Sequence, residues 1–409
     1  MHFSPAVAAS SGVTPPQANP RRAWCSSSIC LALIAVIVWS FIGYYLSHWG
    51  TKWALDLRVY RAAGESLYHG GSPYLLTFTT SRLPFTYPPF ALVVLSPLSL
   101  GSLDLVKALW WSANGIALIA LLYVVVVAAL RVSRREALLL AAAGGGLATL
   151  VLEPLRSNLD YGQINLLIML LVVLDVERVK GRWRGIAVGV AAAIKLTPLT
   201  YLAYFVIDRD RRAAYRGFAT FIIATALAWL ILPSGSERYW FHEVFSPART
   251  GRVGGVSNQS WNAVFHRAPF HGGALGVVLW ASVSVVTFVV GVIVAKWLVE
   301  LGQTIDALLV LALTELLVSP ISWSHHWSWL VIVPVVLVTR WRRDHVVSVS
   351  LVVILLVAIA EPYWWSINGW LGAFLADSLT LAGAVVLVAL IRATKRDLRL
   401  AHQPAKVAD

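Results

Sequence analysis

Long apolar runs, separated by short polar or basic stretches, dominate this sequence. A helix that crosses a membrane needs about 20 apolar residues, and several runs are close to that length or somewhat shorter. These runs lie at residues 29–46, 105–130, 136–156, 161–176, 214–233, 274–298, 306–319, 325–340, 345–361 and 378–392. The pattern predicts an all-α polytopic membrane protein in which the shorter segments are tilted or broken.

Two stretches do not fit a simple crossing. Residues 185–207 are apolar but have basic clusters on both sides, so an even number of crossings must occur in a length too short for two full spans. Lys195 and Pro198 interrupt this stretch, and proline ends or breaks a helix. We therefore predict two half-length helices or a re-entrant hairpin here. Residues 87–100 contain several prolines and are predicted to form a partial or interfacial helix.

The composition narrows the class of protein. Hydrophobic residues make up 58% of the chain and charged residues 13%, against roughly 25% charged in soluble domains. This excludes an ordinary soluble enzyme, a disordered protein and a repeat solenoid. The net charge is +13, which in a soluble chain would indicate nucleic-acid binding. The basic residues lie between the apolar runs, however, as in the cytoplasmic loops of membrane proteins, so we expect no nucleic-acid partner.

Placing the basic clusters in the cytoplasm gives a topology in the plasma membrane. It has about twelve membrane segments, with both termini cytoplasmic. Residues 1–28 are predicted to be a disordered tail, residues 29–392 a single transmembrane domain, and residues 393–409 a C-terminal tail. The outer, periplasmic loops are predicted near residues 47–84, 157–165, 234–273, 319–326 and 361–377.

The sequence shows no cofactor or metal motif. Cys25 and Cys30 offer neither a disulfide framework nor a metal-ligand spacing. HExxH, a Walker loop and GxSxG do not occur. We expect neither a metal nor a cofactor.

The predicted outer segments combine tryptophan with Asn, Gln, Asp, Arg and His. Part of the tryptophan content fits the aromatic belt of a membrane protein. Aromatic rings also stack on the C–H face of a sugar while amides and carboxylates bind its hydroxyls, so the mixture favours a sugar site. The candidate substrate-binding residues are Arg58, Tyr60, Arg61, Tyr87, Asn158, Gln163, Asn165, Lys195, Asn258, Gln259, Trp261, Trp323 and Trp364.

Asp56 is the candidate general base. Its spacing from Tyr60 and Ala63 places the three residues on one helix face. A carboxylate held there can take the proton from an attacking hydroxyl. The alternative is a surface acid paired with Arg58 or Arg61.

Lys195, His325 and His326 are the other candidates for chemistry. A lysine within an apolar stretch indicates a functional site, although its side chain could instead reach the membrane interface. With Arg58, Arg61, Arg249 and Arg252 it could neutralise a phosphate. The adjacent histidines point about 100° apart on a helix, so joint metal binding is disfavoured. One of them is a candidate to bind phosphate or to orient the acid.

Several motifs, in this order along the chain, resemble a known family. They are Asp56-Leu-x-Val-Tyr60, Gly71-x-Pro73-Tyr74, Tyr87-Pro88-Pro89, Gly162-Gln163-x-Asn165, Lys195-x-x-Pro198, Asn258-Gln259-Ser260 and Ser319-Pro320-x-Ser322-Trp323-x-His325-His326. Together they resemble the polyprenyl-phosphate-mannose-dependent α-1,2-mannosyltransferases of actinobacteria, over nearly the whole chain.

The resemblance implies an inverting GT-C type glycosyltransferase whose active site faces outward. It implies polyprenyl-phosphate mannose as donor and a phosphatidylinositol mannoside, a mannosylated membrane glycolipid, as acceptor. The catalytic aspartate of the family falls on Asp56, and its histidine on His325 or His326. Two alternatives stay open: an enzyme that adds α-1,2 branches to lipomannan or lipoarabinomannan, and a flippase or transporter of a lipid-linked sugar.

Overall fold

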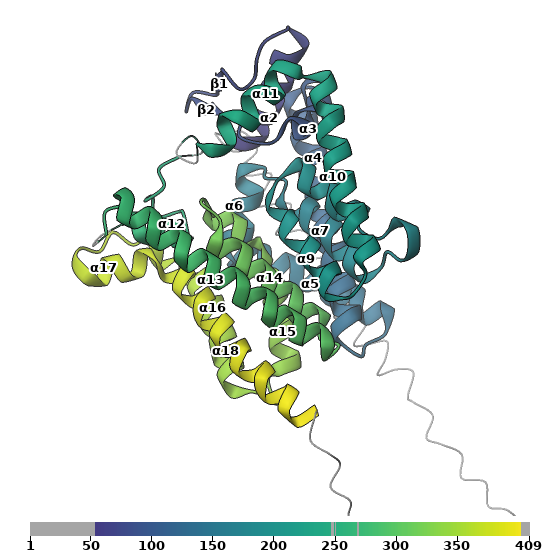
Figure 1. Cartoon of the computed structure of the whole chain (residues 1–409), viewed down its shortest axis with the longest axis vertical. Helices are drawn as coiled ribbons and strands as arrows, with labels where there is room; N and C mark the ends of the chain where they lie inside the picture. The colour runs from purple at the N-terminus through teal and green to yellow at the C-terminus, as the bar shows by residue number, and fades with distance from the viewer. Residues whose placement is uncertain (1–53, 247–248, 250, 268–269, 402–409) are drawn as a thin grey trace, which may run out of the picture.

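The computed structural model describes residues 54–401, except 247, 248, 250, 268 and 269. Regular structure in this part is almost entirely helical (Figure 1). The exception is a small antiparallel hairpin of β1 (Thr77–Phe78) and β2 (Leu83–Pro84), in which Thr77 pairs with Pro84. The predicted tail at 1–28, with Cys25 and Cys30, and the predicted first span at 29–46 lie outside the described residues.

Within the described residues, four helices are long and apolar enough to cross a membrane. They are α4 (Leu103–Ala129), α10 (Arg211–Ile231), α13 (Gly273–Glu300) and α18 (Ser378–Ala401). Each covers all or nearly all of one of the predicted apolar runs. The predicted start of the C-terminal tail, at residue 393, falls inside α18, because Ala393 and Thr394 continue the buried face of that helix.

A fifth crossing is formed if two bent helices are taken together. These are α5 (Arg134–Val151) and α6 (Glu153–Tyr161), which meet at an angle of 85°. Ser133 and Glu136 form a capping box at the start of α5. Pro154 lies in the first turn of α6, where a proline is tolerated. In the interior of one continuous helix it would remove a backbone hydrogen bond, so α5 and α6 are separate helices.

The remaining predicted runs form shorter helices. They are α7 (Asn165–Glu177), α14 (Thr304–Val318), the 3-10 helix η6 (Ser324–Ile332) continued by α15 (Val333–Arg340), and α16 (His345–Ala360). α14 is buried on almost every side and packs against α13 and α18. A helix that is apolar all round requires such a central position.

Both unusual stretches fold as short helices, as predicted. Residues 185–207 form α8 (Ile186–Ile194), a break, the 3-10 helix η3 (Thr197–Tyr201) and α9 (Leu202–Ile207). The short 3-10 helix η2 (Gly181–Trp183) precedes them. Residues 87–100 form α3 (Pro89–Leu95) and η1 (Ser96–Leu100).

The segments predicted as outer loops are more helical than expected. The first contains α2 (Leu55–Tyr68), the helix that the spacing of Asp56 and Tyr60 predicts, and residues 157–161 belong to α6 rather than to a loop. The others contain short helices: α11 (Pro233–Phe241), η4 (Glu243–Phe245), α12 (Trp261–His266), η7 (Pro362–Trp364) and α17 (Gly369–Ala376). Short helices pair the backbone hydrogen-bonding groups that a loop would leave open.

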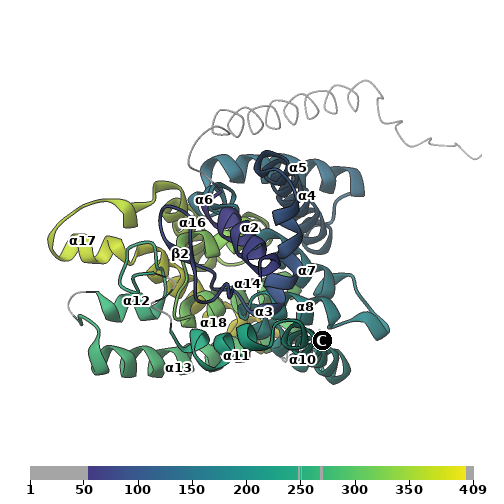
Figure 2. The same cartoon turned by 90° about the horizontal axis from the view of Figure 1, so that it is seen from above.

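The chain brings its early segments together at one end of the molecule. α2, the β1–β2 hairpin and α11 lie at this end, whereas the last turns of α18 point to the opposite end (Figure 1). Seen from above, α12 and α17 extend to one side of the bundle (Figure 2).

Candidate active site

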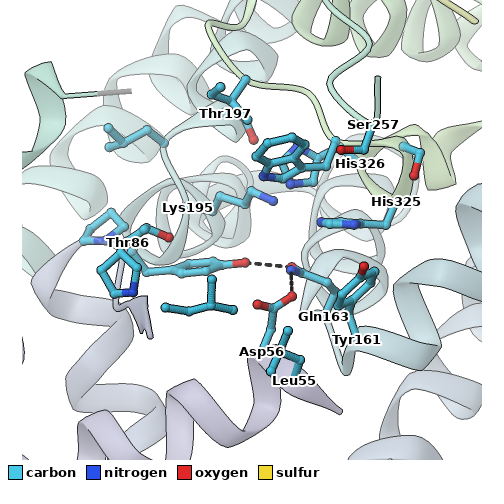
Figure 3. A pocket seen from close by; sticks show the side chains of 18 of the residues that line it. Leu55, Asp56, Thr86, Tyr161, Gln163, Lys195, Thr197, Ser257, His325 and His326 are labelled. Atoms are coloured by element: carbon cyan, nitrogen blue, oxygen red, sulfur yellow. Dashed lines mark hydrogen bonds between the residues drawn. The ribbon is translucent and has the colours of Figure 1, made fainter. Parts of the chain in front are cut away.

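A cavity of about 420 Å³ lies where α2, the segment before α3, the turn after α6, the break after α8 and the segment before η6 meet. This volume is within the range of small-molecule sites. Figure 3 shows Asp56, Lys195 and Gln163 pointing into the same space from different elements. Of the predicted site residues, the cavity is lined by Asp56, Tyr87, Gln163, Lys195, Trp323, His325, His326 and Trp364.

Asp56 lies in the first turn of α2, whose start is tied to the end of α6. The backbone amide of Ala54 donates to the carbonyl of Asp160 over 2.7 Å, which fixes the beginning of α2. One carboxylate oxygen of Asp56 accepts a hydrogen bond from Gln163 at 2.5 Å. Burial raises the pKa of Asp56 to about 6, while the Gln163 hydrogen bond and the charge of Lys195 oppose that rise. A base is most effective with a pKa near the working pH.

Arg58 and Arg61 lie on other faces of α2 and do not line the cavity. Arg61 donates instead to the carbonyl of Gly101 at 2.8 Å. Among the described residues, neither arginine forms an ion pair with Asp56. With about 100° per residue, positions two and five after Asp56 point away from the face that carries it. The interpretation of Asp56 as half of a surface ion pair is therefore wrong.

Gln163 follows a turn that only glycine fits. Gly162 has φ of +69°, and a Cβ on it would lie 2.8 Å from the Cβ of Leu57. The indole of Trp110 donates to the Gly162 carbonyl over 2.8 Å and holds the turn. The amide oxygen of Gln163 accepts from the hydroxyls of Tyr87 at 2.8 Å and Tyr60 at 3.3 Å. Tyr60 thus reaches the site through its neighbours rather than by lining the cavity.

Lys195 lies at the break between α8 and η3, where its backbone is extended. Its Nζ donates to Oδ1 of Asn165 at 2.7 Å and lies 5.7 Å from the ring centre of Tyr87. Nδ2 of Asn165 in turn donates to Asn158 at 2.9 Å. Lys195 therefore faces the cavity instead of reaching outward, and Asn158 and Asn165 support it from behind.

His325 and His326 both line the cavity. Their rings lie 4.8 Å apart and nearly perpendicular. Within the described part of the chain, the buried Nε2 of His325 has no hydrogen-bond partner, so it is available to a ligand. No group of three or more His, Cys, Asp or Glu residues is placed to hold a metal ion in the described residues.

Asn258, Gln259 and Trp261 serve the scaffold in this structure and do not line the cavity. Asn258 is fully buried, and its Oδ1 accepts from the backbone amide of Ser322 at 2.8 Å. Gln259, also fully buried, donates to the carbonyl of Ala376 at 2.7 Å. The indole of Trp261 donates to Thr287 at 3.1 Å. The Asn258 contact fixes the segment that carries Trp323 and the two histidines, and the other two contacts attach this region to the helices behind it.

The two arginines predicted to join Lys195 at a phosphate also lie elsewhere. Arg249 forms an ion pair with Glu243 and donates to the carbonyl of Tyr74. Arg252 is not among the residues that line the cavity. Among the described residues that line the cavity, Lys195 is the one lysine or arginine.

Comparison with known proteins places this site in a family. The model of glycosyltransferase family 87 matches residues 85–320, more than half of the chain. The chain belongs to glycosyltransferase family 87. The matched part of this glycosyltransferase includes Tyr87, Gln163, Lys195 and Asn258, while Asp56 and His325 lie outside it.

Relatives that match most of the chain carry more specific names. A polyprenol-phosphate-mannose-dependent alpha-(1-2)-phosphatidylinositol pentamannoside mannosyltransferase of Mycobacterium tuberculosis is 32% identical over 421 residues, covering 98% of this chain and 94% of the relative. A polyprenol-phosphate-mannose-dependent alpha-(1-2)-phosphatidylinositol mannoside mannosyltransferase of the same species is 30% identical, covering 84% and 82%. A pentamannoside enzyme of Mycolicibacterium smegmatis is 30% identical, covering 74% and 72%. No solved structure matches this chain.

Sequence reasoning missed several residues of this glycosyltransferase site, among them Tyr161 and Glu153. Tyr161 lines the cavity, with its ring 5.3 Å from that of His325. Glu153 is buried, accepting from Ser324 at 2.9 Å and from Tyr363 at 2.6 Å, and so fixes the histidine segment. An acidic residue next to a proline inside an apolar run was the available signal for Glu153.

Proposed function

We propose that this glycosyltransferase moves mannose from polyprenyl-phosphate mannose to a phosphatidylinositol mannoside and forms an α-1,2 linkage. The names of the relatives support the donor, the linkage and the class of acceptor. The observation that carries the chemistry is the convergence of a carboxylate, Asp56, and an amino group, Lys195, on one cavity.

Asp56 acts as the general base. As the acceptor oxygen bonds to the anomeric carbon of mannose, Asp56 takes the proton of that hydroxyl. The bond between the anomeric carbon and the phosphate oxygen breaks, and its electron pair stays on the phosphate. A single displacement of this kind inverts the configuration at the anomeric carbon, so a β-linked donor gives an α-linked product.

Lys195 stabilises the departing phosphate. Its ammonium group offsets the negative charge that develops on the leaving oxygen. The unpartnered Nε2 of His325 adds a hydrogen-bonding group in the same cavity. No step of this reaction requires a metal or a cofactor, since the lipid phosphate itself is the leaving group.

We place this chemistry in a GT-C type fold of about twelve membrane segments. The cavity faces the periplasm, and both termini are cytoplasmic. The distribution of basic clusters supports this orientation. Membership of a glycosyltransferase family favours a transferase over a flippase. Because the names of the relatives differ in acceptor, product analysis has to identify the acceptor, including branched lipomannan.

The decisive experiment replaces Asp56 by asparagine. Wild-type protein in nanodiscs should transfer labelled mannose from polyprenyl-phosphate mannose to a phosphatidylinositol mannoside, with an α-1,2 linkage in the product. Asp56→Asn should lose a factor of about 10²–10⁴ in turnover, the contribution of a general base. Its thermal midpoint at pH 7 should equal or exceed that of the wild type, because a shielded carboxylate has been removed.

Asp104→Asn is the matched control. Asp104 lies exposed in the first turn of α4 and does not line the cavity, so its loss should leave transfer unchanged. Turnover retained in Asp56→Asn would remove Asp56 as the base. Wild-type protein that is folded but inactive with every mannosylated lipid would contradict the proposed reaction.

A further inference from the structure

A chain of hydrogen bonds ends at the carboxylate of Asp56. The hydroxyl of Tyr60 donates to that of Tyr87 at 2.9 Å, and the Tyr87 hydroxyl donates to Oε1 of Gln163 at 2.8 Å. Nε2 of Gln163 then donates to Oδ2 of Asp56 at 2.5 Å. Figure 3 shows the last two of these bonds as dashed lines. Every donor in the chain points toward Asp56.

The two tyrosines determine which way the Gln163 amide faces. Both hydroxyls lie within hydrogen-bond distance of Oε1. Tyr87 donates there at 2.8 Å, and the one proton of Tyr60 goes either to the Tyr87 oxygen at 2.9 Å or directly to Oε1 at 3.3 Å. The flipped amide would place Oε1 against an ionised carboxylate, so that two acceptors would face each other. The observed orientation therefore presents the amide N–H to Asp56 and suits its ionised form.

The same geometry distinguishes the two oxygens of Asp56. Oδ2 is held by Gln163. Within the described residues, Oδ1 has no hydrogen bond, and Asp56 borders the cavity. The backbone of Gln163 is fixed independently, because its own amide donates to Asn158 at 2.9 Å and the preceding glycine is held by Trp110.

We propose that Gln163 is a positioning residue for the catalytic base rather than a substrate ligand. Oriented by Tyr87 and Tyr60, it holds Oδ2 of Asp56 and leaves Oδ1 as the atom that takes the acceptor proton. This inference rests on the proposed role of Asp56.

A positioning role of this kind has a pH signature. The groups that bear on the charge of Asp56 are Lys195 and the hydroxyls of Tyr60, Tyr87 and Tyr161. Burial raises the pKa of Asp56, and the Gln163 hydrogen bond counteracts that rise. Losing the amide donor while Asp56 stays buried must therefore raise the pKa further.

The test compares pH profiles of kcat/KM for wild type and Gln163→Leu in nanodiscs. The acid limb of the wild type should have its midpoint near pH 6. In Gln163→Leu the midpoint should rise by about one unit, the effect of losing a hydrogen bond to a charged group. The loss of kcat/KM that comes from the smaller fraction of ionised Asp56 is then about fivefold at pH 6, and it should vanish near pH 8.5. Tyr87→Phe, which removes one of the two orienting hydroxyls, should shift the midpoint in the same direction by less.

Trp280→Phe is the control. It removes the 3.2 Å hydrogen bond from its indole to the carbonyl of Val318, away from the cavity. Any loss it causes should be equal at every pH. If Gln163→Leu does not fold, Gln163→Glu replaces it, and the added carboxyl group should raise the midpoint at least as much.

The outcomes separate the hypotheses. A Gln163→Leu defect that is equal at all pH values, or a raised acceptor KM with an unmoved midpoint, would overturn the inference and return Gln163 to the substrate-binding residues. Retained turnover in Asp56→Asn would instead overturn the proposed function, whatever Gln163 does.

Discussion

Asn258→Leu should lower stability and turnover together while leaving both KM values close to those of the wild type. The side chain of Asn258 joins the segment at residues 253–262 to the segment that carries Trp323 and the histidines. Its Oδ1 accepts from the Ser322 amide at 2.8 Å, and its Nδ2 donates to the Val253 carbonyl at 2.9 Å. Asn258 also forms an isolated antiparallel bridge with Trp323.

The size of the effect follows from the groups left without a partner. Leucine has the branched shape of asparagine but is larger, and it neither donates nor accepts a hydrogen bond. The Ser322 amide, in a residue that is 1% exposed, loses its hydrogen bond, and the less buried Val253 carbonyl loses one as well. The hydroxyl of Ser260, which is fully buried, also loses the oxygen to which it donates at 3.1 Å. An unsatisfied buried polar group costs about 1–3 kcal/mol, and with part of the Val253 cost met by water the three lost bonds amount to about 4 kcal/mol.

The assay pairs thermal unfolding with transfer kinetics in the same nanodiscs. Unfolding of a membrane protein is often irreversible, so midpoints are compared at one scan rate. Asn262→Leu is the graded control, since it removes one hydrogen bond to the Pro320 carbonyl at 3.0 Å and leaves Asn258 in place. Its midpoint should fall by less. An unchanged midpoint in Asn258→Leu together with a raised KM would refute the reasoning and make Asn258 a substrate ligand.

The remaining predictions concern the two charged groups of the cavity. Wild-type kcat/KM should fall about tenfold per unit below pH 6, because Asp56 acts as a base only when ionised and its pKa is raised to about 6; a flat profile down to pH 5 would contradict that role. Lys195→Met should weaken binding of the polyprenyl-phosphate donor by about tenfold or more, the worth of a charge-assisted hydrogen bond, with little change for the acceptor. Equal losses for donor and acceptor in binding measurements would argue against a phosphate contact.

Sequence periodicity predicted the features that depend on residues close together in the chain, namely helix faces and helix breaks. The spacing of Asp56 and Tyr60 placed both on one side of a helix, and Pro198 marked the break that exposes Lys195 to the cavity. The same helical spacing also indicates that Arg58 and Arg61 point away from the side of the helix that carries Asp56, so that they were poor candidates for the cavity.

Contacts between distant segments left no comparable signal. The partner of Asn258 is a backbone amide 64 residues away, and that of Gln163 is a carboxylate 107 residues away. The sequence pattern of an asparagine or glutamine in a predicted loop is the same whether its side chain binds a sugar or a neighbouring backbone group. The helical state of residues 157–161 was likewise hidden, because it depends on packing of α6 against η6.

The nine-residue helix α6 determines how the catalytic base and the histidine segment are placed relative to each other. Its last turn receives the Ala54 amide at the start of the helix that bears the base, and the Gln163 turn follows directly. Its first residue, Glu153, holds the histidine segment through Ser324. Base, orienting amide and histidines are therefore all attached to the two ends of one short helix, so a substitution that shifts α6 would displace all three groups together rather than one of them.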